Sequence, residues 1–342
     1  MTFSATVAPV LPGVGTPTGT VTFLVTNGVT TVSLTGTLSG GTVSVSTNGL
    51  VTAGVYSVTA TYSGDGNFTG SVGADTQTVA PAATTTTVSS SPDPSVVGET
   101  VTFSATVAPV SPGAGTPTGT VTFLVTDGVT TVSLTGTLSG GSTSVSTNGL
   151  VTAGVYSVTA TYSGAGNFTG SVGADTQTVG VASTTTAVTT SPDPSVVGET
   201  VTFTATVSPV SPGAGTPTGT VTFVATDGVT TVSLTGTLSG GTTSVSTNGL
   251  VTAGSYTVTA TYSGDGNFSG SVGSDTQTVN QASTTTAVTT SPDPSVFGES
   301  VTLSATVSPV SPGAGTPTGT VTFVVTGGPT LTATLSGGTA SV

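Results

Sequence analysis

The sequence lacks lysine, arginine, histidine, cysteine and tryptophan, and its 13 aspartate and glutamate residues give the 342-residue chain a net charge of −13 at pH 7. Without His or Cys it cannot form an imidazole base, a thiolate nucleophile, a disulfide or a usual zinc site. Without Lys or Arg it cannot neutralise phosphates or dock on an anionic bilayer. We therefore expect no nucleic-acid partner, no membrane insertion and no enzyme activity.

Long apolar runs are also missing, because no segment approaches the roughly 18 apolar residues of a membrane span. The first thirty residues carry no positive charge, so no signal peptide is visible. The absence of cysteine leaves the redox compartment undecided, whereas low charge and abundant Thr and Ser favour the outside of a cell. We expect an extracellular or cell-surface protein whose secretion signal is not present in this chain.

A repeat with a period of 100 residues organises the chain. The ten-residue rows at 1, 101, 201 and 301 read MTFSATVAPV, VTFSATVAPV, VTFTATVSPV and VTLSATVSPV. About 100 residues is the size of an autonomous β-sandwich domain, whereas solenoid repeats are much shorter. The first domain is expected to lack its first strand, and the last domain its final strands. The predicted domains, named copies 1 to 4 below, are 1–80, 84–179, 184–279 and 284–342.

Apolar residues alternate with period two inside copy 2, which is typical of strands with one dry face. Val101, Phe103, Ala105 and Val107 are expected to point inward. No segment has a helical period, so the pattern predicts an all-β fold in which two sheets close on each other. Asp127-Gly128 predicts a type I′ hairpin turn. The predicted strands number about seven per domain and in copy 2 span 84–90, 100–108, 119–126, 129–138, 143–147, 154–162 and 175–179.

Several motifs in a fixed order connect the sequence to a known family. Leu150, Ala153, Gly154 and Tyr156 are typical of the tyrosine corner of Greek-key sandwiches, whose Tyr hydroxyl bonds upstream backbone. The segments TTTTVSSSPDPSVVGETVTFSATV, GTPTGTVTF and LVTAGVYSVTATYSGAGNF resemble the bacterial Ig-like domain repeat family (group 3), and the resemblance covers the whole chain. It implies tandem Ig-like Greek-key β-sandwiches on extracellular or surface proteins, often adhesins or stalks, and no catalytic residues.

Acidic residues in the turns and beside the SPDPS joints are the only candidates for a metal site. Calcium needs six to eight oxygen ligands, and two carboxylates are too few unless a neighbouring domain supplies more. Copy 2 has Ala165 in place of the turn aspartate. We therefore expect no cofactor, with calcium as the alternative. The candidate calcium residues are Asp65 and Asp265 in the turns, and Asp93, Glu99, Asp193, Glu199, Asp293 and Glu299 beside the joints.

The same turns carry three sequences that match the N-glycosylation pattern. The alternative is a hairpin turn whose Phe plugs the end of the core. These segments are Asn67-Phe68-Thr69, Asn167-Phe168-Thr169 and Asn267-Phe268-Ser269.

Three functional hypotheses remain from the sequence. The first is a non-catalytic, semi-rigid, rod-like stalk or fibre on a microbial surface, because two prolines in each SPDPS joint limit its conformations. The second is an adhesin-type module that binds a carbohydrate or protein receptor. The third is a filament subunit that assembles by strand complementation at the incomplete end domains. The expected partners are accordingly other copies of itself, neighbouring domains of a longer array, or a surface receptor or glycan.

Overall fold

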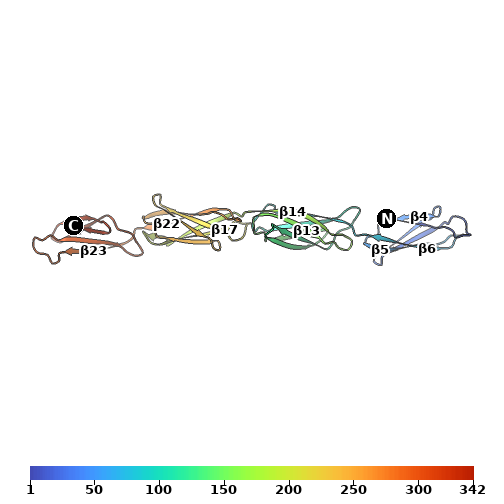
Figure 1. Cartoon of the computed structure of the whole chain (residues 1–342), viewed down its shortest axis with the longest axis horizontal. Coiled ribbons are helices and arrows are strands. Elements are labelled where there is room, and N and C mark those ends of the chain that lie inside the picture. Colours follow the sequence, from blue (N-terminus) through green and yellow to red (C-terminus); the bar gives the residue numbers. More distant parts are fainter. The chain divides into compact units, whose positions relative to one another are not determined.

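All regular elements of the chain are β-strands in the computed structural model, which describes residues 1–342 (Figure 1). The all-β prediction is therefore confirmed. Copy 1 contains β1 (Thr2–Thr6), β2 (Thr20–Thr26), β3 (Thr31–Thr37), β4 (Thr42–Ser46), β5 (Gly54–Tyr62) and β6 (Ser71–Val79). Copy 2 contains β7 (Thr84–Ser91), β8 (Ser95–Val96), β9 (Val101–Pro109), β10 (Thr120–Thr126), β11 (Thr131–Thr137), β12 (Ser142–Thr147), β13 (Gly154–Tyr162) and β14 (Ser171–Gly180).

The later copies follow the same order of strands. Copy 3 contains β15 (Thr184–Ser191), β16 (Ser195–Val196), β17 (Val201–Pro209), β18 (Thr220–Thr226), β19 (Thr231–Thr237), β20 (Thr242–Thr247), β21 (Gly254–Tyr262) and β22 (Ser271–Asn280). Copy 4 contains β23 (Thr284–Ser291), β24 (Thr302–Pro309), β25 (Thr320–Val324), β26 (Thr330–Thr334) and β27 (Thr339–Ser341).

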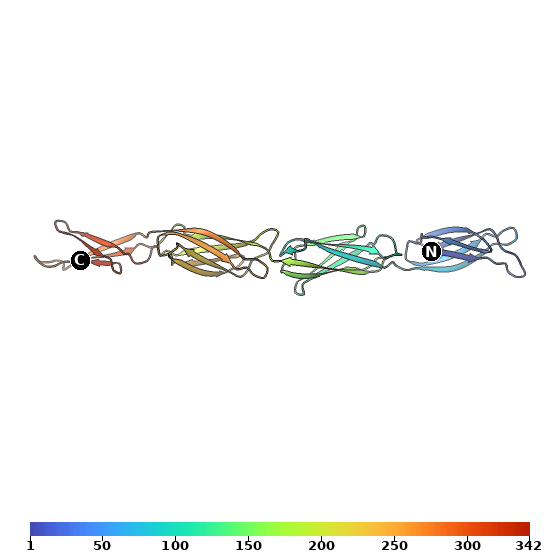
Figure 2. The ribbon, with the colours of Figure 1, turned by 90° about the horizontal axis from the view of Figure 1, so that it is seen from above.

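Copies 2 and 3 each contain two sheets whose strands form facing layers (Figure 2). In copy 2 one sheet has the order β12-β9-β7 and the other β11-β10-β13-β14-β8, and copy 3 repeats both orders. The short strand β8 runs parallel to β14, pairing Ser95 with Val179. Two sheets joined in this way make the β-sandwich that the alternating sequence predicts.

The core of each sandwich lies between the two sheets. Val101, Phe103, Ala105 and Val107 of β9 are buried, as their alternation predicts. Phe103 lies across from Phe123 of β10, with ring centroids 6.4 Å apart. Large aromatic side chains bury the most apolar area, so this pair anchors one sheet on the other.

A tyrosine closes one end of the sandwich as the motif predicts. In copy 1 the Tyr56 hydroxyl donates a 2.9 Å hydrogen bond to the carbonyl oxygen of Thr52. A second tyrosine, which the motif did not reveal, acts at the other end of the same strand. The Tyr62 hydroxyl donates to the carbonyl oxygen of Thr18 at 2.8 Å. Both hydroxyl groups are thereby satisfied inside an otherwise apolar core.

The outward faces of the strands carry pairs of hydroxyl groups instead of ion pairs. In copy 2, Ser104 and Ser144 lie opposite each other with their hydroxyl oxygens 2.8 Å apart, and Thr102 and Ser146 make the next pair at 2.8 Å. Cross-strand pairs of this kind stabilise a sheet modestly, by about 0.2–1 kcal/mol each.

Three details of the sequence prediction were wrong, and the first is that it omitted the short strand β8. The loop after β10 has four residues, 127–130, and Asp127 has a negative φ, whereas a type I′ turn requires positive φ at both central residues. Its carboxylate instead accepts hydrogen bonds from the backbone N–H groups of Val129 and Thr130, at 2.9 and 2.6 Å. The last strand of copy 2 begins at Ser171, not at 175, as it does in copy 1, where the equivalent Ser71 pairs with Tyr62 of β5.

The chain divides into two compact units. One consists of Met1–Pro94, Val101–Thr147 and Val155–Thr178, and the other of Ser95–Thr100, Asn148–Gly154 and Val179–Val342. Neither unit coincides with a single copy, so the division into four domains at the predicted boundaries stays a prediction. No helix in the chain could span a membrane.

Candidate functional site

The turn aspartate of copy 1 is fully used in hydrogen bonding. One oxygen of Asp65 accepts from both the backbone N–H and the hydroxyl of Thr18, each at 2.7 Å. The other oxygen accepts from the N–H groups of Asn67 and Phe68, at 2.8 and 2.9 Å. These bonds hold the pKa of Asp65 well below its usual range, and the bond from the Thr18 hydroxyl lowers the pKa most. The carboxylate therefore acts as a cap that joins the turn to the Thr18 loop.

Copy 3 repeats this cap, whereas copy 2 forms the turn without it. Burial opposes ionisation of Asp265, but the bonds it accepts from Thr218 and the following turn outweigh burial and lower its pKa. In copy 2 the backbone of Ala165 and Phe168 exchanges hydrogen bonds of 3.1 and 3.0 Å. The carboxylate is thus not required for the turn to form.

The acidic residues beside the joints also bind backbone N–H groups. Asp93 accepts a 2.9 Å bond from the N–H of Thr178, and Glu99 accepts one of 2.9 Å from the N–H of Val96. The chain has no group of three or more acidic side chains suited to a metal ion. Three other joint carboxylates also accept hydrogen bonds from backbone N–H groups: Asp193 from Thr278, Glu199 from Val196 and Glu299 from Val296. The side chain of Asp293 is exposed.

The asparagines of the glycosylation-type segments differ in exposure and in hydrogen-bond partners. Asn67 is exposed. Asn167 instead reaches copy 1, where its side-chain oxygen accepts a 2.7 Å bond from the N–H of Ala53 and its side-chain nitrogen donates at 3.1 Å to the carbonyl oxygen of Val51. All three residues belong to the same compact unit. We call this pair of bonds the asparagine clasp.

The second compact unit contains an equivalent bond. There the side-chain oxygen of Asn267 accepts from the N–H of Ala153 at 2.9 Å. The sequence alone did not indicate this role, because a segment such as GNF also fits a glycosylation site or a turn. The signal available was that Asn stays in all three turns while the aspartate two residues earlier is replaced by Ala165 in copy 2.

The connecting segments pair with the same turns. Ala82 donates to the carbonyl oxygen of Asn167 at 2.7 Å and accepts from the N–H of Thr169 at 2.9 Å, which makes a short parallel bridge opposite Phe168. Ala182 repeats the bridge opposite the turn of copy 3 and is completely buried. The segment before each of these copies is therefore an ordered part of the fold.

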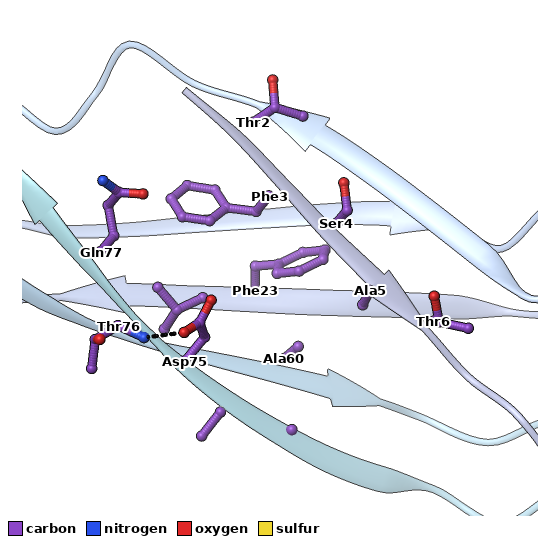
Figure 3. A pocket seen from close by; sticks show the side chains of 13 residues that line it. Thr2, Phe3, Ser4, Ala5, Thr6, Phe23, Ala60, Asp75, Thr76 and Gln77 are labelled. Carbon is purple, nitrogen blue, oxygen red and sulfur yellow. Dashed lines mark hydrogen bonds between the residues drawn. The ribbon is translucent and has the colours of Figure 1, made fainter.

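A slot of about 330 Å³ opens into copy 1 between β1 and β6. Its lining comes from the inward face of β1, from Phe23 and Val58, and from 73–77 of β6. Figure 3 shows Phe3 and Phe23 in this slot, and their ring centroids are 6.3 Å apart. Asp75 accepts a hydrogen bond from the N–H of Thr76 at 2.8 Å, drawn as the dashed line in Figure 3.

Copy 2 has a strand where copy 1 has the slot. Strand β7 pairs with β9 along Thr84–Ser91, and its inward side chains cover the face of β14. As a result Gln177 and Val179 are buried in copy 2, whereas the corresponding Gln77 and Val79 are only partly buried. The slot of copy 1 therefore corresponds to the space that β7 occupies in copy 2.

Aromatic side chains, which sugar-binding sites place on the surface, are mostly inside the sandwiches. Tyr56, Tyr156 and Tyr256 are completely buried, and among the exposed large apolar side chains the only aromatic one is Phe297.

Parts of the chain align with solved structures at low sequence identity and low TM-score. The fibronectin(III)-like modules of Clostridium thermocellum CbhA align over 57% of this chain and 94% of their own, with 18% identity and a TM-score of 0.23. Escherichia coli alpha-2-macroglobulin activated by porcine elastase aligns over 81% of this chain, with 12% identity and a TM-score of 0.27. This chain covers only 31% of that macroglobulin. No curated protein sequence matches the chain.

The sequence matches a protein family over most of its length. The model described as bacterial Ig-like domain (group 3) matches residues 1–80, 87–182 and 188–280. Domains of this family are typically non-catalytic and are often found in tandem in extracellular or surface proteins. With most of its length matched in three consecutive copies, and with two-sheet sandwiches in the matched regions, this chain belongs to the bacterial Ig-like domain (group 3) family.

Proposed function

We propose that the chain is a non-catalytic, semi-rigid spacer in the stalk of a microbial cell-surface or secreted protein. The observation that carries this proposal is the asparagine clasp, in which one side chain makes two hydrogen bonds to the backbone of the preceding copy. A spacer needs joints that resist bending. A catalytic protein would need a convergent set of reactive groups, and the carboxylates described above instead bind backbone N–H groups.

The clasp restrains a joint because it binds two points of one loop. Asn167 holds both the N–H of Ala53 and the carbonyl oxygen of Val51, so rotation of one copy about the connecting segment must break at least one bond. A hydrogen bond of this type contributes about 0.5–1.5 kcal/mol net. The paired segment at Ala82 adds two backbone bonds to the same turn.

The test is a distance measurement across the joint. The chain has no cysteine, so Val29→Cys and Val129→Cys introduce two unique labelling sites, and both valines are exposed, at 85% and 91%. Double electron–electron resonance between spin labels at these sites then reports the distribution of distances. We expect a narrow distribution that broadens in Asn167→Ala.

Asn67→Ala is the matched control, because it removes the same side chain from copy 1, where it is exposed. This variant should leave the distribution unchanged. A wild-type distribution as broad as that of Asn167→Ala would contradict the proposed spacer. Exposure at the surface is tested separately with an antibody on intact cells that produce the protein, and labelling only after lysis would contradict it.

The receptor-binding alternative has less support. Stacking of a sugar ring needs an exposed aromatic side chain, and the tyrosines of the strands are buried. Glycan-array binding by the purified chain would restore this alternative.

A further inference from the structure

The first and last segments of copy 3 run side by side in the same direction. Strands β15 and β16 begin this copy, and β22 ends it. Ser195 of β16 pairs in parallel with Val279 of β22, and the N–H of Val197 donates to the carbonyl oxygen of Asn280 at 2.9 Å. The other strand pairings of copy 3 are antiparallel. The parallel contact therefore joins the two strands by which the chain enters and leaves the copy.

Side chains continue this contact to the start of β15. The Thr184 hydroxyl oxygen lies 2.7 Å from the carbonyl oxygen of Ser269 and 2.8 Å from the hydroxyl oxygen of Ser271. The hydroxyl of Thr186 lies 2.7 Å from that of Ser271. The backbone of Thr186 also lies directly against Gly273, where a Cβ could not be accommodated. We call the contact between residues 184–197 and 269–280 the parallel seam.

A buried glutamine holds the middle of the parallel seam. Gln277 is completely buried, and its side-chain nitrogen lies 3.0 Å from the carbonyl oxygen of Pro192 and 3.2 Å from the hydroxyl oxygen of Ser195. Next to it, the carboxylate of Asp193 accepts a 2.8 Å bond from the N–H of Thr278. Both bonds to the bend between β15 and β16 join residues 85 positions apart, as the bond from Thr184 does. A constant separation is what two neighbouring segments that run in parallel must show.

Copy 2 repeats the bonds of the parallel seam. The side-chain nitrogen of Gln177 donates to the carbonyl oxygen of Pro92 at 3.0 Å, and the carboxylate of Asp93 accepts from the N–H of Thr178 at 2.9 Å. These residues are again 85 positions apart, and β8 pairs in parallel with β14. The seam is therefore a feature of both copies.

The direction of the two segments decides how the parallel seam responds to tension. Tension along the chain acts on copy 3 at Thr184, where β15 begins, and at Asn280, where β22 ends. Because the two segments run in the same direction, this tension pulls them in opposite directions along their own axes. The hydrogen bonds of the seam then share the load and have to break together. Forced unfolding is governed by the rate of crossing the unfolding barrier, so bonds that must all break at the barrier slow it most.

We propose that the parallel seam is a load-bearing element, which keeps copies 2 and 3 folded when the chain is pulled along its length. The chain has no cysteine, so no disulfide can carry such a load. The seam resists extension within a copy, whereas the asparagine clasp resists bending between copies.

The experiment pulls copy 3 in two directions within the full chain. Pairs of cysteines introduced at exposed positions accept DNA handles for optical tweezers, because the chain has no other cysteine. Val181→Cys with Gln281→Cys applies the load from the start of the copy to its end, and both side chains are exposed. Val181→Cys with Gly266→Cys applies the load across the seam from one end, since the exposed turn at Gly266 leads directly into β22 and has room for a side chain. We expect a several-fold higher unfolding force for the first pair, because in the second the bonds break one after another.

A substitution inside the parallel seam and one outside it separate mechanical from thermal stability. Gln277→Leu keeps a buried side chain of similar size but removes the bonds to Pro192 and Ser195, so it should lower the unfolding force along the chain. Val221→Ala is the matched control, because Val221 is completely buried in β18, which pairs with β19 and β21 and not with the seam. This control should lower the thermal unfolding temperature and leave the unfolding force along the chain nearly unchanged.

Equal unfolding forces in the two pulling directions would overturn the proposal. It would also be overturned if Val221→Ala lowered the force along the chain as much as Gln277→Leu does. Circular dichroism checks that each variant retains its strands, and the comparison of pulling directions decides the question even if Gln277→Leu does not fold. The proposal does not rest on the spacer proposal, because the clasp involves none of the seam residues. A flexible joint would broaden the spin-label distances and leave the unfolding force of copy 3 as it is.

Discussion

Gly173 lies directly against the carbonyl oxygen of Thr86, so closely that a side-chain carbon at this position could not be accommodated. Gly273 has the same relationship to Thr186 in copy 3. Neither glycine has a positive φ, so the requirement is one of space and not of backbone conformation. The close approach is where the first strand of each sandwich crosses the last.

Gly173→Ala should therefore destabilise copy 2. The methyl group would force β7 away from β14, and overpacking of this kind costs about 1–3 kcal/mol. Calorimetric unfolding of the full chain should show one transition shifted to lower temperature. Gly73→Ala provides the control, since it adds the same methyl group where nothing lies within 4 Å, and an equal shift in both variants would refute the argument.

Ala165→Asp should stabilise copy 2 at neutral pH by introducing the cap that copies 1 and 3 have. Hydrogen bonds to the carboxylate lower the pKa of Asp65 and Asp265. A lowered pKa gives stability that is present above the unfolded value of about 3.9 and is lost as pH falls through the folded value. Unfolding of the wild type and variant at pH 7 and in acid measures the difference, which should disappear in acid. Ala165→Asn, whose new side chain carries no charge, should change the stability by the same amount at both pH values.

Tyr262 should titrate at unusually high pH. Burial and then the charge of Asp265 raise its pKa to about 12. The pKa of a tyrosine in the unfolded chain is about 10. The stabilisation that comes from keeping Tyr262 neutral is therefore complete below about pH 10 and is lost as the pH rises through about 12. Ultraviolet titration of tyrosinate should find a late-titrating group that is absent in Tyr262→Phe. In Asp265→Asn the same group should titrate at lower pH, and an unchanged titration would contradict the role of the charge.

Calcium and its removal should leave the stability of the chain unchanged. The carboxylates of Asp93 and Glu99 already accept bonds from backbone N–H groups, and no third acidic residue joins them. The measurement is the unfolding temperature in chelator and in excess calcium. A rise with calcium that is abolished by Asp93→Asn would instead establish a metal site at the joint, and magnesium serves as the control ion.

The alternating positions around Phe103 were sufficient to predict the strands, because one face of each strand is buried and the other is wet. Strand β8 was not predictable, since Ser95–Val96 is too short to have a period and forms by parallel pairing with Val179. The turn at Asp127 was predicted in place but not in type, because its aspartate satisfies the loop N–H groups from the side chain. Local sequence thus determined which residues form strands, and loop chemistry decided how they connect.

The candidate site was less predictable. The clasp depends on Asn167 meeting a loop 114 residues earlier in the chain, and no local pattern encodes that meeting. The contact between β7 and β14 was not predictable either, because the hydroxyl groups of Thr84 and Ser171, 2.8 Å apart, belong to residues 87 positions apart in the sequence.

The paired hydroxyl groups of the outward faces, such as Ser104 with Ser144, affect how the stability of the protein depends on salt concentration. Neutral pairs are not screened by dissolved ions, whereas repulsion among the 13 acidic side chains is weakened by them. With no cation in any side chain, added salt has no attractive ion pair to break. The sheets should therefore be equally stable at low and at high salt concentration, and added salt should not destabilise the chain as a whole.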